Sequence, residues 1–247
     1  MELKNIFKME LFKNYHDKSY RIVVAILAVM AAISAVSIFI DNHTFTSRIF
    51  TGFGGVILML ILIFTWIGTC IFALLYPFHL LNIDYKNKVM SLIFASGVSR
   101  THYYVVKVGA TILSTLIALA IIAFIPFLLL VVANPEIIVK AVREIFEDFE
   151  LSHIFAASLW AVLHVIGVLV MLTTAVIITK GKTSGLFLFF GFLFVAVNLQ
   201  RLFIPSYFVI NTNLEPTQLF YFSSIGALVE IAVFVLIGLR VLRKQDL

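Results

Sequence analysis

The sequence is poor in the residues on which most soluble folds and metal sites depend. A single cysteine, Cys70, excludes an internal disulfide, and no C-x-x-C pair is present. Charged residues make up only 13% of the chain, about half the share found in soluble domains. Hydrophobic residues make up 62%, and the mean hydropathy is +1.10. This composition excludes an ordinary soluble domain.

Catalytic and nucleotide-binding motifs are also missing. H-E-x-x-H and G-x-S-x-G do not occur, and the six histidines are scattered. Gly181-Lys182-Thr183 resembles the end of a phosphate-binding loop, but Val176 stands where the first glycine of that loop belongs. An apolar helix is expected before it, whereas the motif requires a strand. We therefore expect this chain to be no enzyme and to hold neither a metal nor a cofactor.

Six long apolar stretches dominate the chain. They lie at about 21–40, 52–81, 105–132, 153–178, 185–203 and 218–239. Each is as long as or longer than the ~20 residues that a helix needs to cross the hydrocarbon core. The sequence therefore predicts an all-α integral membrane protein with six transmembrane helices.

The basic residues predict how these helices are oriented. Twelve of the 18 Lys and Arg residues lie before the first stretch, in the second and fourth gaps, or after the last stretch, and Arg21 and Lys107 at the adjoining span ends bring this side to fourteen. Because basic loops stay cytoplasmic, both termini should face the cytoplasm. The net charge of +5 is spread over these four segments, so we expect anionic lipid and not nucleic acid beside them. The first stretch is too long for a signal peptide and should remain as a span.

Residues 1–20 are expected to form a separate element before the six-helix domain at 21–247. An apolar stripe at i, i+4 spacing consists of Leu3, Phe7, Leu11 and Tyr15, with Glu10 and Lys18 close to it. This pattern predicts an amphipathic helix on the inner membrane surface. The alternative is a solvated basic tail.

The third gap predicts an amphipathic helix outside the membrane. Asn134-Pro135-Glu136 is a typical helix start. The segment from Glu136 to Glu150 carries five carboxylates and two basic residues. Its acidic residues Glu144, Glu147 and Glu150 are candidates for a gate that meets a cationic substrate. The alternative is a structural cap on the spans.

The second gap has the features of a cytoplasmic docking element. Val89, Leu92, Ile93 and Phe94 form a candidate hydrophobic knob, and Lys86, Lys88 and Arg100 supply charge. Gly97 can end a short helix in a left-handed conformation, and Ser99 can cap the helix that follows. The alternative is a basic loop that only sets topology.

This gap resembles the loop of the permease subunits of second-type ABC exporters. The resemblance rests on a cytoplasmic acid, Asp84, on the short helix ending in small residues, on Ser99-Arg100 and on Lys107 seven residues later. Asp84 stands where the family usually has Glu, and Gly97-Val98 stands where the family also allows Pro. The six-span layout and the preceding surface helix are similar too.

The resemblance implies a coupling helix that docks into a separate ATPase subunit. Two copies of that subunit would bind ATP and Mg²⁺, and a second permease copy, identical or different, would complete the exporter in a bacterial cytoplasmic membrane. The layout is most similar to small peptide exporters of the phenol-soluble-modulin and lantibiotic-immunity type. The expected cargo is therefore an amphipathic or hydrophobic peptide.

Two polar residues inside the spans leave other functions open. Glu230 lies about 15 Å, and His164 about 24 Å, from the inner boundary at 1.5 Å per residue. The difference of about 9 Å argues against direct pairing. An intramembrane carboxylate nevertheless points to a protein or aqueous neighbour. The alternatives are a proton-coupled carrier or channel that uses both residues, and a non-transporting membrane immunity protein.

Overall fold

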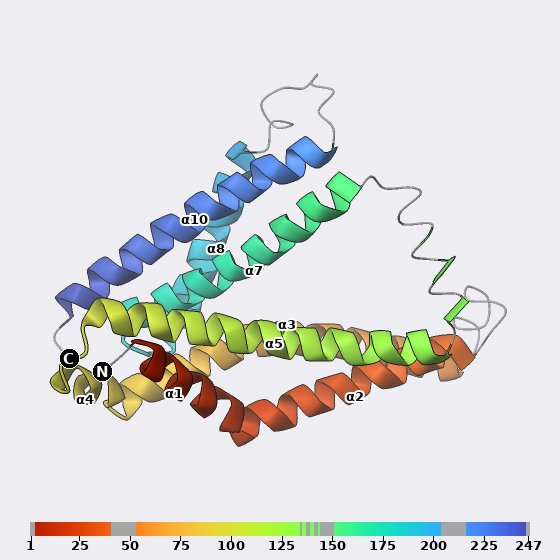
Figure 1. Cartoon of the computed structure of the whole chain (residues 1–247), viewed down its shortest axis with the longest axis horizontal. Coiled ribbons are helices and arrows are strands. Elements are labelled where there is room, and N and C mark those ends of the chain that lie inside the picture. The colour runs from red at the N-terminus through yellow and green to blue at the C-terminus, as the bar shows by residue number, and fades with distance from the viewer. Residues whose placement is uncertain are drawn as a thin grey trace. The chain divides into compact units, whose positions relative to one another are not determined.

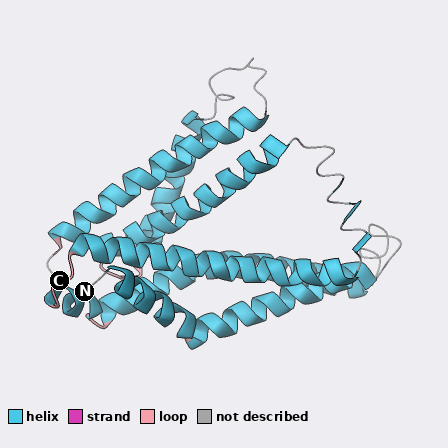
Figure 2. Ribbon diagram, viewed as in Figure 1, coloured by secondary structure: helices cyan, strands magenta, loops and turns pink. Residues whose placement is uncertain are grey.

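The computed structural model describes residues 3–40, 53–133, 135–136, 139–140, 143, 151–203 and 216–245. Within these ranges the chain is helical and has no strand (Figure 2). In chain order the helices are α1 (Leu3–His16), α2 (Lys18–Ile40), α3 (Phe53–Lys86), α4 (Val89–Ala95), α5 (Arg100–Ala133), α7 (Leu151–Ile178), α8 (Ser184–Phe203) and α10 (Pro216–Lys244). The all-α class predicted from the sequence is confirmed.

Five helices of the described part, α2, α3, α5, α7 and α10, are long and apolar enough to cross a membrane. They and α8 expose large apolar side chains, such as Trp66 (73% exposed) and Phe187 (81% exposed). Surfaces of this kind are rare on soluble proteins, so the chain is a multi-pass helical membrane protein. The sixth predicted span coincides with α8, whose apolar segment, Ser184–Leu199, is shorter than the other five.

Several helices continue beyond the apolar stretches that predicted them. The prediction began the third span at Val105, but α5 begins at Arg100 because Ser99 caps it. The Ser99 Oγ atom accepts a hydrogen bond from the backbone N–H of His102 at 3.2 Å. In the same way, Asp17 Oδ1 accepts one from Ser19 N–H at 3.0 Å at the start of α2. Capping side chains therefore set the helix ends, whereas hydropathy sets only the apolar centres.

The chain divides into two compact units, and the division falls inside α1, α3 and α5. The first unit consists of Met1–Lys8, Pro77–Ile112 and Asp148–Leu247, and the second consists of Met9–Tyr76 and Leu113–Glu147. In α3 the division falls at Pro77, a proline inside the helix. A proline at this position removes one backbone donor from the helical ladder.

The first unit is built around α7, the most buried of the five apolar helices. It packs along α10, and α8 lies against both (Figure 1). A side-chain hydrogen bond joins α7 to α10, since the Thr174 hydroxyl donates to the carbonyl of Phe234 at 3.0 Å. At Gly238 the backbone of α10 meets the ring of Tyr104 from α5, and a β-carbon there would lie 2.7 Å from the Tyr104 hydroxyl.

The second unit is held at the junction of α1 and α2 by aromatic rings and hydrogen bonds. Tyr20 packs on Tyr76 with ring centroids 4.9 Å apart, and its hydroxyl donates to the carbonyl of Ser114 at 3.1 Å. Asn14 Nδ2 donates to Ser114 Oγ at 3.2 Å, and the Tyr76 hydroxyl donates to the Asn14 carbonyl at 3.1 Å. These bonds join α1, α2, α3 and α5 through buried polar groups.

The N-terminal helix is present, but its buried face differs from the predicted stripe. The fully buried positions are Ile6, Glu10 and Asn14, whereas Leu11 and Tyr15 are only half-buried. Phe12, on another side, is 63% exposed. The apolar pattern was misleading because the amide nitrogen of Asn14 donates a hydrogen bond inside the unit, to Ser114, so that a polar residue can be buried.

Candidate functional site

The second gap forms a short helix, α4, set off sharply from its neighbours. Lys88 before it has a φ of 53°, and Gly97 after it has a φ of 87°. The helix closes as expected, since Ser96 N–H and Gly97 N–H donate to the carbonyls of Leu92 and Phe94. Left-handed residues at both ends separate α4 from the helices before and after it. α4 therefore stands as an independent seven-residue element between α3 and α5.

The predicted knob is divided between two faces of α4. Leu92 is 69% exposed, and Val89 and Ile93 are half-exposed. Phe94 turns inward: its ring meets the Tyr103 ring edge-on at 5.4 Å, and the Arg100 guanidinium lies 5.7 Å from its centroid. Lys86 and Lys88 are exposed at the entrance to the helix. Leu92 and these lysines thus form the outer surface of the loop, and Phe94 belongs to its support.

Asp84 lies inside the protein, where it fastens the base of the loop. Its carboxylate oxygen Oδ2 is 2.5 Å from Lys107 Nζ, and both side chains are buried. The same oxygen accepts a hydrogen bond from the Tyr103 hydroxyl at 3.1 Å. A buried carboxylate is stable when it is paired and hydrogen-bonded in this way. The Asp84–Lys107 pair joins the end of α3 to the first turns of α5.

Arg100 also supports the loop from within. Its Nη1 atom donates to the backbone carbonyls of Leu242, Arg243 and Gln245, at 3.2, 2.8 and 2.6 Å. Helix ends leave carbonyls without a partner, and a guanidinium supplies donors that are always charged. The predicted docking charge Arg100 therefore caps the C-terminal end of α10 and ties it to α5.

Gln245 completes the support by connecting α10 to two further helices. Its Nε2 atom donates to the carbonyl of Ile177 at the end of α7, and its Oε1 atom accepts from the Tyr85 hydroxyl at 3.1 Å. We call the set Asp84, Tyr85, Arg100, Lys107 and Gln245 the α4 anchor. Sequence reasoning did not find Tyr85 or Gln245, because nothing local marks contacts between residues 160 positions apart.

The intramembrane candidates Glu230 and His164 lie nearer to each other than the sequence estimate allowed. A β-carbon at Gly167 would be 3.7 Å from Glu230 Oε1, so the carboxylate of α10 is level with Gly167 of α7. His164 lies three residues earlier, on the same side of that helix. Its ring stacks on Trp160 at 5.7 Å. Three residues correspond to about 4.5 Å along α7, which is about half the offset of about 9 Å estimated from the sequence.

A cavity of about 330 Å³ lies between α8 and α10 on another side of Glu230. Its walls are almost entirely apolar and include Phe192 and Val195 of α8 and Val233 and Phe234 of α10. Since the Glu230 oxygen faces Gly167, mainly the stem of this side chain meets the cavity. The arrangement suits an apolar occupant more than a charged one.

The predicted external gate residues Glu144, Glu147 and Glu150 lie outside the described residues. In the part of the chain that the structure covers, no three His, Cys, Asp or Glu side chains come close enough to hold a metal ion. Comparison of the chain with known protein families, curated proteins and solved structures finds no match.

Proposed function

We propose that this chain is the transmembrane subunit of an ATP-driven exporter, and that α4 is the helix that docks into a separate ATPase subunit. The observation that supports this most is the form of α4. An exposed leucine, Leu92, projects from a short helix whose base is fastened by buried charges at Asp84 and Lys107. A docking element must be accessible and stiff, and α4 has both properties.

The remaining features of the proposal follow from the same topology. Both termini and α4 are cytoplasmic, as the distribution of Lys and Arg favours. The helix α8 is the sixth span, because its 20 residues give about 30 Å of helix, which equals the hydrocarbon thickness. The host membrane is a bacterial cytoplasmic membrane, and α1 lies at its inner surface.

The working assembly is two permease chains with two ATPase subunits, each holding ATP and Mg²⁺. Closure of the ATPase subunits pushes on α4, and the α4 anchor passes that movement to α5, α7 and α10. The cargo class is an amphipathic or hydrophobic peptide, which the apolar cavity between α8 and α10 can contact. Cytolytic and antimicrobial peptides fit this description.

The proposal is tested by purifying the full chain from membranes of its native host and measuring the bound ATPase activity. Leu92→Asp and Leu92→Ala should both reduce retention of an ATPase subunit, because one buries a charge in the docking cleft and the other removes the apolar contact. Asn87→Asp is the matched control, since it adds the same charge on the exposed loop without removing an apolar group. Equal retention in all four proteins would overturn the docking assignment.

A proton-coupled carrier is the second candidate, and one observation favours it. The Glu230 carboxylate lies one helical turn from the position of His164, and paired titratable groups inside a membrane are typical of proton relays. This candidate needs no ATPase subunit. The two functions are therefore separated by the energy source that drives transport.

A further inference from the structure

The last turns of α10 carry a shallow hollow with basic residues at one end. Its volume is about 440 Å³, and its lining residues are Leu236, Leu239, Arg240, Arg243 and Lys244. These positions follow the i, i+3, i+4, i+7, i+8 pattern, so they share one face of the helix. The leucines lie on the side of the apolar span, and the basic residues lie at its end.

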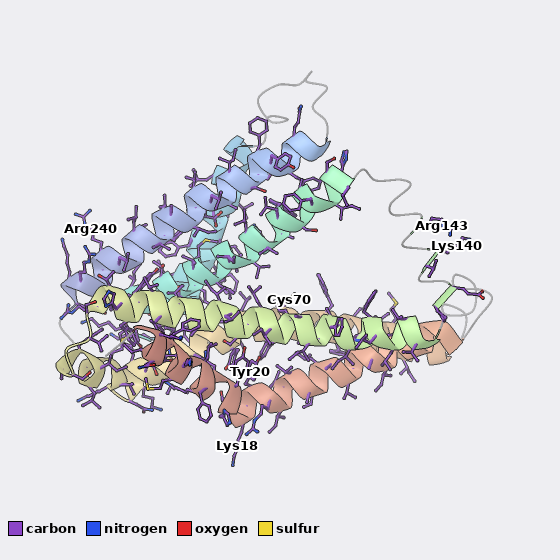
Figure 3. The ribbon with its side chains drawn as sticks, in the orientation of Figure 1. Lys18, Tyr20, Cys70, Lys140, Arg143 and Arg240 are labelled. Carbon is purple, nitrogen blue, oxygen red and sulfur yellow. The ribbon has the colours of Figure 1, made fainter. Side chains whose placement is uncertain are left out.

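This face of α10 points away from the rest of the first unit. The buried positions of the same turns are Phe234, Gly238 and Leu242, which lie roughly opposite the hollow at 3.6 residues per turn. Leu236 is 66% exposed, and Figure 3 shows Arg240 on the outer side of α10. In a membrane-spanning helix, such a face meets lipid.

The positive charge of the hollow is not neutralised by the described part of the protein. There, neither Arg240 nor Lys244 forms an ion pair with an acidic side chain. Basic residues often compensate the carbonyls at a helix C-terminus. Here Arg100 already binds the carbonyls of Leu242 and Arg243, so the cations of the hollow are available to another anion.

One of these cations is held in place by the α4 anchor. The Arg243 Nη2 atom donates to Thr101 Oγ1 at 3.2 Å, and the Arg243 carbonyl accepts from Arg100 at 2.8 Å. Arg243 is therefore oriented before any ligand arrives. Preorganised groups lose less freedom on binding.

We propose that this hollow binds an anionic phospholipid. The phosphate headgroup contacts Arg240, Arg243 and Lys244, and an acyl chain lies along Leu236 and Leu239. An amphiphile of this form matches both the charge and the polarity gradient of the site, and basic sites at helix ends are known to attract such headgroups. Because Arg243 is fastened to α5, the bound lipid also steadies the junction between α10 and α5.

The test uses the full chain in detergent and follows its apparent melting temperature during titration with phosphatidylglycerol. Ligands that bind only the folded state raise this temperature. Phosphatidylglycerol should raise it, whereas phosphatidylcholine, which lacks net charge, and glycerol phosphate, which lacks acyl chains, should not. In Arg240→Gln/Lys244→Gln the phosphatidylglycerol affinity should fall about fivefold for each charge removed. This variant leaves the contacts of Arg100 and Arg243 intact.

A matched control removes the same amount of charge elsewhere on the exposed surface. Lys86→Gln/Lys88→Gln should keep the wild-type response to phosphatidylglycerol, because both lysines precede α4. A response that falls equally in both variants would show a non-specific charge effect and overturn the site. A response to glycerol phosphate as large as that to phosphatidylglycerol would overturn the lipid assignment in favour of free phosphate.

Discussion

The carboxylate of Asp84 and the amine of Lys107 form a buried ion pair at 2.5 Å. Asp84 precedes α4 in the sequence, and Lys107 follows it. The pair fixes the separation between the end of α3 and the start of α5. The Tyr103 hydroxyl donates to the same carboxylate oxygen, so the charge has a second partner. The position of α4 therefore depends on residues that never reach its surface.

Breaking this pair from either side should destabilise the protein. We expect Asp84→Asn or Lys107→Met to lower the free energy of unfolding by about 3–5 kcal/mol, because each leaves one buried group without its partner. The double variant should lose less than either single variant, since it buries no unpaired charge. SDS-induced unfolding followed by the fluorescence of the two tryptophans measures all four proteins. Additive losses in the double variant would show that the two groups act independently.

Arg100 should keep the last turn of α10 from fraying. Arg100→Gln removes the charged donor from three backbone carbonyls, and charge-assisted bonds of this kind contribute about 1.5–3 kcal/mol each. We expect faster amide hydrogen exchange in residues 238–245, with Arg100→Lys intermediate because one amine replaces the fork-shaped guanidinium. Unchanged exchange in Arg100→Gln would mean that α10 ends without help from α5.

Gly238 should not tolerate even one added methyl group. A β-carbon there would lie 2.7 Å from the Tyr104 hydroxyl and 2.9 Å from its ring, and overpacking of this kind costs about 1–3 kcal/mol. The control is Gly191→Ala on α8, where a β-carbon meets nothing within 4 Å. That change should be neutral or stabilise by up to about 1 kcal/mol, because Ala favours helix. In a Tyr104→Ala background, the further loss caused by Gly238→Ala should be smaller than in the wild type, because the ring that the β-carbon meets is gone; thermal unfolding in detergent measures all four proteins.

Glu230→Gln separates the two candidate functions. The change keeps the shape and a hydrogen-bonding end but removes the titratable charge. If a proton relay operates, flux driven by a pH gradient in liposomes without any ATPase should be abolished. If the chain is an exporter in which this charge contributes, ATP-driven export should fall while membrane abundance and ATPase retention stay normal. Full export by the variant would show that the carboxylate is silent.

The parts of the fold that could be predicted from the sequence are those with a local cause. The span centres follow from apolar length. The end of α4 and the start of α5 follow from Gly97 and Ser99, which act on the backbone within a few residues. The buried face of α1 could not be predicted in this way. It depends on Asn14 meeting Ser114, a partner 100 residues away.

The same difference between local causes and distant partners applies to the candidate site. Leu92 is exposed, as expected of an apolar knob on the loop, and its docking role stays a prediction. The sequence pattern assigned Arg100 to that surface as well, and the resemblance made Asp84 part of the coupling loop, although both side chains support the loop from within. A charge in a loop looks the same in the sequence whether it meets solvent or a helix end. Only tertiary packing decides between the two.

The contacts of Arg100 can form only late in the synthesis of the protein. The loop around α4 is translated early, yet the carbonyls that Arg100 binds belong to residues 142 to 145 positions later. Until the ribosome has passed Gln245 and α10 has entered the membrane, this part of the α4 anchor cannot form. A nascent chain therefore displays α4 with the Asp84–Lys107 pair but without the contacts that Arg100 makes to α10. The α4 anchor is thus complete only after α10 and Gln245 have been synthesised.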